Sequence, residues 1–233
     1  MVNIEQYLSR HYIHRSNWLR AAVLGANDGI ISISSIAIGV AAANANKAPI
    51  VLATIAGLVA GALSMAAGEY VSVSSQTDIE QADIAREAKE LKEMPEEELK
   101  ALAAIYEQRG LKSETAMQVA KELSAIDALA AHVREELGIS EVMKANPIQA
   151  AFASGAAFIS GGLVPLLVTL FFPIQNMEFT LYGFSILFLI LLGIISAKTG
   201  GAKVWKAIVR VVFWGTLAMG VTAFVGYLFG VNI

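Results

Sequence analysis

Several acidic side chains and one histidine have the spacing of metal ligands on helix faces. Four carboxylates at positions i, i+3, i+7 and i+10 would lie along one side of a helix: Glu80, Asp83, Glu87 and Glu90. Further along the chain, His132 and Glu136 are separated by one helical turn and would share a face as well. Carboxylates with an imidazole suit divalent cations of intermediate hardness, such as Fe²⁺, Mn²⁺ or Zn²⁺. The alternative interpretation is a solvated acidic face that Arg86 and nearby lysines partly neutralise.

Two further candidates, Asp28 and Met65, lie inside stretches that are otherwise apolar. A carboxylate within a membrane-spanning helix is costly, so Asp28 is by default a functional residue. If the two stretches cross a membrane antiparallel to each other, Met65 lies near the depth of Asp28, and Glu69 lies near the mouth. A carboxylate and a thioether at one depth suit a softer metal than Mg²⁺ or Ca²⁺. The alternatives are a structural hydrogen bond for Asp28 and plain apolar packing for Met65.

One aspartate and one methionine are too few ligands for an ion that has lost its water shell. A twofold axis between subunits would double the set, because a symmetric interface presents the same residues twice. Glycines at small-xxx-small spacing, Gly25 with Gly29 and Gly57 with Gly61, would let helices approach closely within one chain or between subunits. We therefore expect a homodimer with a shared metal path.

The composition indicates a membrane protein with one charged insertion. The chain has 233 residues, of which 56% are hydrophobic and 16% charged, and it has no cysteine. Of its 20 acids, 16 lie between Asp78 and Glu141. This distribution excludes an ordinary soluble globule, a disordered chain, a disulfide-built domain and cysteine-based metal or thiol chemistry. The net charge of −3, without a basic patch, gives no indication of nucleic-acid binding.

Five apolar stretches are long enough to span a bilayer. They are residues 20–43, 49–70, 147–172, 177–197 and 204–229. Lysines and arginines precede the first stretch, recur in the insertion and return between the fourth and fifth stretches. Because such residues favour the cytosolic side, we expect the N-terminus and residues 71–146 to be cytosolic and the C-terminus to lie outside.

The sequence pattern of the insertion predicts three amphipathic helices. No glycine or proline interrupts residues 69–94, so the second membrane helix could continue into the cytosol. A second helix would start at Pro95 and end at Gly110, and a third, capped by Ser113, would run to Gly138. The apolar stripe of the third helix comprises Ala116, Ala120, Leu123, Ile126, Ala130, Val133 and Leu137. The predicted fold is all-α: a five-helix membrane bundle (1–70 and 147–233) with a three-helix cytosolic domain (71–146) inserted between its second and third spans.

Two membrane motifs resemble one known family. Residues 25–32 (GANDGIIS) resemble the first-helix signature of the vacuolar iron transporter family, and residues 61–73 (GALSMAAGEYVSV) resemble its second-helix signature. Residues 75–80 (SQTDIE) and 136–138 (ELG) continue the match, which covers essentially the whole chain from His14. The likeness is to a bacterial-type member, which would place the protein in a plasma membrane.

The resemblance implies a five-span homodimer that moves Fe²⁺, and often Mn²⁺, out of the cytosol in exchange for protons. Asp28 and Met65 match the residues that line the family's path. Glu87, Glu90 and Glu136 match glutamates with which its cytosolic domain collects metal. The candidate metal ligands are therefore Glu87, Glu90, Glu97, Glu98, His132 and Glu136. Besides Fe²⁺ and Mn²⁺, Co²⁺ and Zn²⁺ are candidate ions.

The chain departs from the family pattern at two places. A Met-Met pair shortly before the last glutamate corresponds here to His132 and Val133. The glutamate pair on the second cytosolic helix is not cleanly reproduced, because Lys100 follows Glu97 and Ala101 follows Glu98 at the required spacing. A histidine could substitute as a ligand.

The sequence therefore predicts a proton-coupled exporter of divalent metal in the lipid bilayer. Metal would pass from the acidic domain by Glu69 to Asp28 and Met65, and protonation of Asp28 would release it, because proton and metal compete for one carboxylate. The alternative is a membrane-anchored protein that buffers or senses metal without transport. An enzyme is not expected, because all three histidines lie outside the spans and the Glu-x-x-His pairs of a di-iron bundle are missing.

Overall fold

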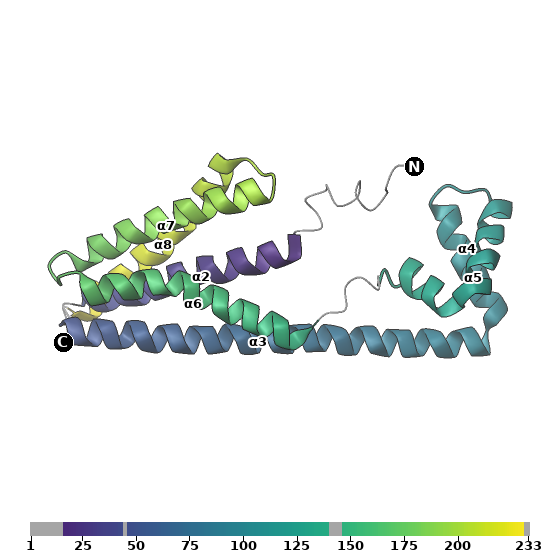
Figure 1. Cartoon of the computed structure of the whole chain (residues 1–233), viewed down its shortest axis with the longest axis horizontal. Helices are drawn as coiled ribbons and strands as arrows, with labels where there is room; N and C mark the ends of the chain where they lie inside the picture. Colours follow the sequence, from purple (N-terminus) through teal and green to yellow (C-terminus); the bar gives the residue numbers. More distant parts are fainter. Residues whose placement is uncertain (1–15, 44–45, 140–145, 231–233) are drawn as a thin grey trace. The chain divides into compact units, whose positions relative to one another are not determined.

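A computed structural model describes residues 16–43, 46–139 and 146–230. The regular elements in these ranges are α2 (Ser16–Ala42), α3 (Lys47–Glu93), α4 (Pro95–Gln108), α5 (Ser113–Glu135), α6 (Pro147–Phe171), α7 (Met177–Thr199) and α8 (Val204–Gly230) (Figure 1). The described residues contain no strand. The predicted all-α fold is confirmed.

Within the part of the chain that the structure describes, five helices are long and apolar enough to cross a membrane. They are Ala22–Ala42 within α2, together with α3, α6, α7 and α8. These helices agree with the five predicted spans. As the lack of glycine and proline between residues 69 and 94 predicted, α3 continues without a break through 47 residues to Glu93. Its first half is apolar and its second half is highly charged.

Contacts divide the chain into two compact units. Residues up to Tyr70, together with Ile148 onward, form the first, which we call the membrane unit. Val71–Pro147 form the second, which we call the inserted unit. The membrane unit contains α2, α6, α7, α8 and the first half of α3, and the inserted unit contains the second half of α3 with α4 and α5.

Small residues allow the backbones of α2 and α6 to touch in the membrane unit. A Cβ atom added to Gly161 would collide with the carbonyl oxygen of Ala26, and one added to Gly29 would collide with that of Phe158. A buried cluster of Ile33, Leu58, Ala62 and Phe158 joins the same helices to α3. Close helix contact through small residues is typical of membrane bundles, where burial in lipid gives no hydrophobic gain.

The core of the inserted unit lies between α4 and α5. Leu102, Ala103, Ala120 and Ala131 are buried there, and Leu99, Tyr106, Met117 and Leu123 pack around them. Glycines with positive φ follow both helices, Gly110 at 97° and Gly138 at 67°. They end the helices as predicted, because glycine enters this backbone region without a steric penalty.

The continuous apolar stripe predicted for α5 is wrong beyond Leu123. Asp127 has φ −160° and ψ 99°, so α5 is kinked into two segments there, and Ile126 is 85% exposed. The Asp127 carboxylate accepts a hydrogen bond from the Ala130 N–H at 2.9 Å and so caps the second segment. The start of α5 also differs from expectation, because Lys112 is the N-cap residue and no side chain caps it.

Candidate metal centre

Four of the predicted ligands meet in the inserted unit. Glu87 of α3, Glu98 of α4, and His132 and Glu136 at the end of α5 offer ligand atoms within 4.8 Å of one another. We call this group the EEHE cluster. The Nδ1 atom of His132 lies 2.9 Å from Glu87 Oε1, 3.1 Å from Glu136 Oε2 and 3.9 Å from Glu98 Oε2. Three carboxylates therefore surround one imidazole nitrogen.

Each helix places its ligand through ordinary packing. Glu98 lies one turn before the buried Leu102 on the core face of α4, whereas its neighbour Glu97 is exposed. On α5, the second segment that begins after Asp127 brings His132 into the core, with no exposed side-chain surface. One turn later, Glu136 follows as the C-cap residue, and its N–H bonds to the His132 carbonyl at 2.8 Å.

The burial of these polar groups is not fully compensated by hydrogen bonds. Among the described residues, Glu87 Oε1 and His132 Nε2 are buried and have no hydrogen-bond partner. Although Glu87 Oε1 lies close to His132 Nδ1, the pair lacks hydrogen-bonding geometry. An unsatisfied buried polar group costs about 1–3 kcal/mol. A cation held between the carboxylates would offset part of that cost.

The electrostatics of Glu87 fit a cation site. Burial is the largest cause that raises the pKa of this carboxyl, and the Glu136 carboxylate raises it further. His132 opposes the shift, while Glu98 and Glu90 add to it. This part of α3 lies beyond the apolar stretch that ends at Tyr70. The fold therefore crowds negative charge around a buried oxygen, an arrangement that a divalent ion would stabilise.

The cluster leaves its solvent edge open. Glu87 and Glu98 expose only 4% and 13% of their side chains, whereas Glu136 exposes 40%. One ligand can therefore leave and return without unpacking the core. Three carboxylates and one imidazole are ligand types that suit divalent cations of intermediate hardness.

The other predicted ligands do not join the cluster. Glu90 is half-buried on α3 and close enough to influence Glu87, but it is not among the four that converge, and neither is Glu97. Earlier on α3, Asp83 pairs with Arg86 at 3.2 Å, and Glu80 accepts a hydrogen bond from Gln76 at 3.0 Å. That part of the acidic face is paired with nearby side chains and does not converge on the cluster.

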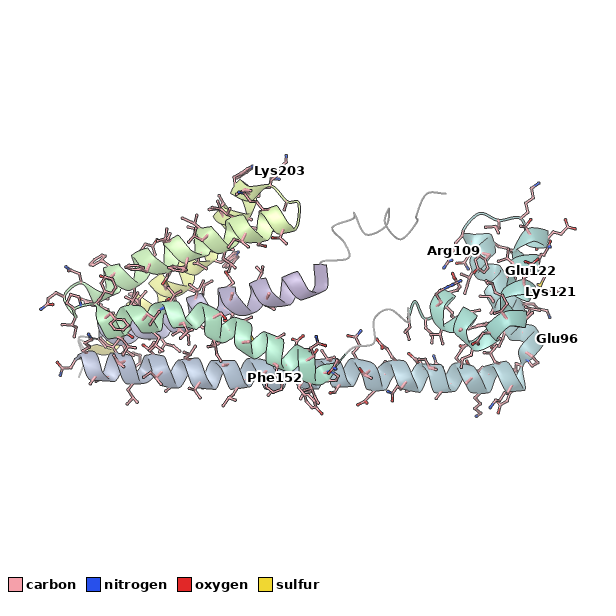
Figure 2. The ribbon with its side chains drawn as sticks, viewed as in Figure 1. Glu96, Arg109, Lys121, Glu122, Phe152 and Lys203 are labelled. Carbon is pink, nitrogen blue, oxygen red and sulfur yellow. The ribbon has the colours of Figure 1, made fainter. Side chains whose placement is uncertain are left out.

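An ion-pair network next to the cluster was not predicted. Arg109, which is labelled in Figure 2, lies after the end of α4 and pairs with Glu135, and Arg134 bonds to the same carboxylate at 2.8 Å. Burial alone would raise the pKa of Glu135, but the hydrogen bonds from Arg109 and Arg134 hold it below its usual range. The network fixes the residue immediately before Glu136. The sequence signal was an arginine just past α4, but arginines at helix ends are common.

The predicted path residues lie in the membrane unit. Asp28 of α2 is half-buried and accepts a hydrogen bond from the Ser32 hydroxyl, one turn away. Met65 of α3 packs against the cluster that contains Ile33 of α2. Glu69 is half-buried near the boundary of the unit. The structure thus brings Met65 and α2 to one apolar cluster and gives the Asp28 carboxylate a local hydrogen bond.

One buried oxygen beside Asp28 has no partner among the described residues. It is Oδ1 of Asn27. Ser35, two turns further along the face of α2 that carries Asp28, is also buried with an unpartnered hydroxyl. By contrast, Ser34 bonds to Ser185 of α7 at 2.6 Å. The stripe of α2 that carries Asp28 is therefore polar and incompletely satisfied, which is costly in a bilayer.

The chain matches known proteins along nearly its whole length. The model of the VIT family matches residues 19–227. The vacuolar iron transporter of Acanthamoeba castellanii is 44% identical over 214 residues, or 91% of this chain and 79% of that protein. Vacuolar iron transporter homolog 1 of Oryza sativa subsp. japonica is 38% identical over 223 residues (95% and 78%). Vacuolar iron transporter homolog 2.1 of Arabidopsis thaliana is 36% identical over 220 residues (92% and 84%).

Proposed function

The chain belongs to the VIT family, and from that premise we propose that it exports Fe²⁺ from the cytosol in exchange for protons. The relatives named vacuolar iron transporter support iron as the cargo. The single observation that carries the proposal is the EEHE cluster, a ligand group for a divalent ion on a chain with five candidate spans. Mn²⁺ has similar ligand preferences and would be a second cargo.

In this proposal the EEHE cluster collects metal on the cytosolic side. Its negative charge attracts cations, and its exposed Glu136 lets an ion enter and leave without unfolding the unit. The cluster only has to concentrate metal on the cytosolic side. Its residues carry no covalent chemistry, and we propose no enzymatic reaction for the protein.

Asp28 is the proposed meeting point of metal and proton. A metal binds only the deprotonated carboxylate, so a proton that arrives from the far side would displace the ion. Met65 would supply a thioether ligand, and Glu69 would lie at the entrance. The exposed apolar face of α3, which includes Leu52, Val59 and Leu63, is available for a second subunit. A homodimer would then supply two Asp28 and two Met65 side chains to one path.

The proposed orientation follows the basic residues. Lys198, Lys203, Lys206 and Arg210 lie around the α7–α8 connection, whereas residues 172–176, between α6 and α7, contain no lysine or arginine. By the positive-inside rule, the α7–α8 connection, the N-terminus and the inserted unit are cytosolic, and the C-terminus is outside. In a bacterial cell the membrane would be the plasma membrane.

Transport in proteoliposomes tests the proposal. Purified protein with Fe²⁺ on the side of the inserted unit should move the metal when the opposite compartment is acidic. Asp28→Asn should reduce flux to the level of protein-free vesicles, while Glu178→Gln, which also removes an acid from the membrane unit, should leave flux near wild type. Metal binding without flux would instead favour the buffering alternative, and unchanged flux in Asp28→Asn would remove the role given to Asp28.

A further inference from the structure

Three basic side chains gather at the start of α8 around a surface pocket. The pocket has a volume of about 430 Å³ and is lined by Ala202, Lys203, Trp205, Lys206, Val209 and Arg210. Lys203, Lys206 and Arg210 are spaced i, i+3 and i+7, so they line one face of the helix. Figure 2 shows Lys203 projecting outward at the turn between α7 and α8. We call this the basic pocket.

The described residues place no acidic partner beside the cations of the basic pocket. Among the described residues, no carboxylate lies within salt-bridge distance of Lys203, Lys206 or Arg210. The described part of the membrane unit has only three acids, Asp28, Glu69 and Glu178. Like charges on one helix face repel, and a bound anion would relieve that repulsion.

The helix itself makes this cation placement less favourable. The first turn of an α-helix carries partial positive charge and prefers acidic side chains. The first turn of α8 contains no acidic side chain. Lys203 lies just before the helix, and Lys206 lies within its first turn. Repulsion among the side chains and repulsion from the helix end thus act in the same direction. A bound anion would relieve both.

The apolar wall of the pocket indicates what kind of anion it accepts. Trp205 is 62% exposed and Val209 is 56% exposed, one turn apart on α8. The Lys206 ammonium lies 5.8 Å from the centre of the Trp205 ring. Tryptophan is enriched at the interface between membrane and water, where its ring lies at headgroup level. Cations beside exposed apolar surface at the end of a span fit an amphiphile with a negative head and an apolar chain.

We propose that the basic pocket binds the phosphate headgroup of an anionic phospholipid in the leaflet that surrounds the α7–α8 turn. Lys203, Lys206 and Arg210 contact the headgroup, and Trp205 and Val209 lie along the acyl chain. Basic pockets at the ends of membrane helices are suited to such lipids. The proposal is independent of the metal path and would hold for a protein that does not transport.

Quenching of Trp205 by brominated lipids tests the proposal on the full chain. The background Trp18→Phe/Trp214→Phe leaves Trp205 as the fluorophore. This protein is reconstituted in phosphatidylcholine vesicles with increasing fractions of brominated phosphatidylglycerol or brominated phosphatidylcholine. Brominated phosphatidylglycerol should quench at the lower fraction. Replacing Lys203, Lys206 and Arg210 by glutamine should raise the fraction required by about fivefold for each cation removed.

Matched variants distinguish lipid binding at the basic pocket from an effect of the total charge of the protein. Lys100→Gln/Lys112→Gln/Lys121→Gln removes the same charge from the inserted unit and should not change quenching, and Lys203→Arg/Lys206→Arg should retain the preference. If the triple variant does not fold, the single change Lys203→Gln gives the same comparison. Equal quenching of the wild-type pocket by the two lipids would overturn the proposal. Displacement of brominated phosphatidylglycerol by inorganic phosphate would also overturn it, because the site would then hold a free anion.

Discussion

The membrane unit and the inserted unit use polar side chains in opposite ways. In the membrane unit acids are rare, and most buried hydroxyl groups bond within their own bundle, as Ser34 does with Ser185. In the inserted unit three carboxylates converge on one buried imidazole. Among the described residues each unit has two buried side-chain atoms without a partner, but only in the inserted unit do such atoms belong to a convergent group of ligands. A bundle in lipid gains stability by satisfying polar groups, whereas a domain in water can hold a partly satisfied ligand group. The difference separates a unit whose single deep carboxylate has a local hydrogen bond from a unit whose carboxylates converge as cation ligands do.

The removal of a buried ligand from the inserted unit should have the largest effect on metal binding. Glu87→Gln should weaken the binding of Fe²⁺ to the full-length protein by about 100-fold or more, because even outer partners of metal ligands are worth about 10–100-fold. The measurement is a competition titration against a chelator. Glu114→Gln, an exposed acid on α5, serves as the control and should bind as wild type. Wild-type affinity in Glu87→Gln would contradict the assignment. The same titration of Glu97→Gln decides whether that candidate contributes.

Backbone contact in the membrane unit should be intolerant of added side chains. Gly161→Ala places a Cβ against the Ala26 carbonyl and should destabilise the detergent-solubilised protein by about 1–3 kcal/mol. Gly183→Ala is the control, because a Cβ there meets nothing within 4 Å. Thermal unfolding in detergent compares the two. Equal midpoints would mean that α2 and α6 are less tightly packed than described.

The inserted unit should be more stable when its buried charge is removed. Because the folded-state pKa of Glu87 is raised, its contribution to stability is fully present below the ordinary glutamate pKa and is lost as the pH rises through the folded pKa. Without metal at neutral pH, Glu87→Gln should therefore unfold later than wild type, by about 1 kcal/mol. Thermal unfolding at about pH 4 and about pH 7 would measure this difference in stability between the variant and wild type. A lower midpoint for Glu87→Gln at neutral pH would show that the carboxylate stabilises the metal-free fold.

The Arg109–Glu135 pair should have the smallest effect. Arg109→Gln frees the residue before Glu136 and should weaken Fe²⁺ binding by about threefold, as expected for a half-exposed ion pair. Arg109→Lys should recover part of that loss, because it keeps the charge without the planar guanidinium. The readout is the same chelator competition. A loss as large as that of Glu87→Gln would show that the network does more than orient the end of α5.

Much of this organisation could be predicted from the sequence. The length of the apolar runs predicted the five candidate spans, and one-turn spacing predicted the contact between His132 and Glu136, which is 3.1 Å. The choice of Glu98 over Glu97 also follows from spacing, because Glu98 lies one turn from Leu102 on the core face.

The remaining features depend on a single residue or on packing. The kink in α5 arises because Asp127 has a non-helical backbone and caps the next segment. The spacing of apolar residues every 3.6 positions does not reveal a single non-helical residue of this kind. The kink also explains why Ile126, which fits the periodic stripe, is exposed. The pairing of Arg109 with Glu135 depends on how α4 packs against α5, which local sequence patterns do not encode.

The central claim is that His132 and the carboxylates around it bind the metal. Pulsed electron paramagnetic resonance of Mn²⁺ bound to the full-length protein tests it most directly, since a coordinating imidazole gives a nitrogen coupling. We predict this coupling in wild type and in His11→Gln/His14→Gln, its loss in His132→Gln, and displacement of the Mn²⁺ signal by Fe²⁺. A metal with only oxygen ligands in wild type, or a nitrogen coupling that persists in His132→Gln, would contradict the account.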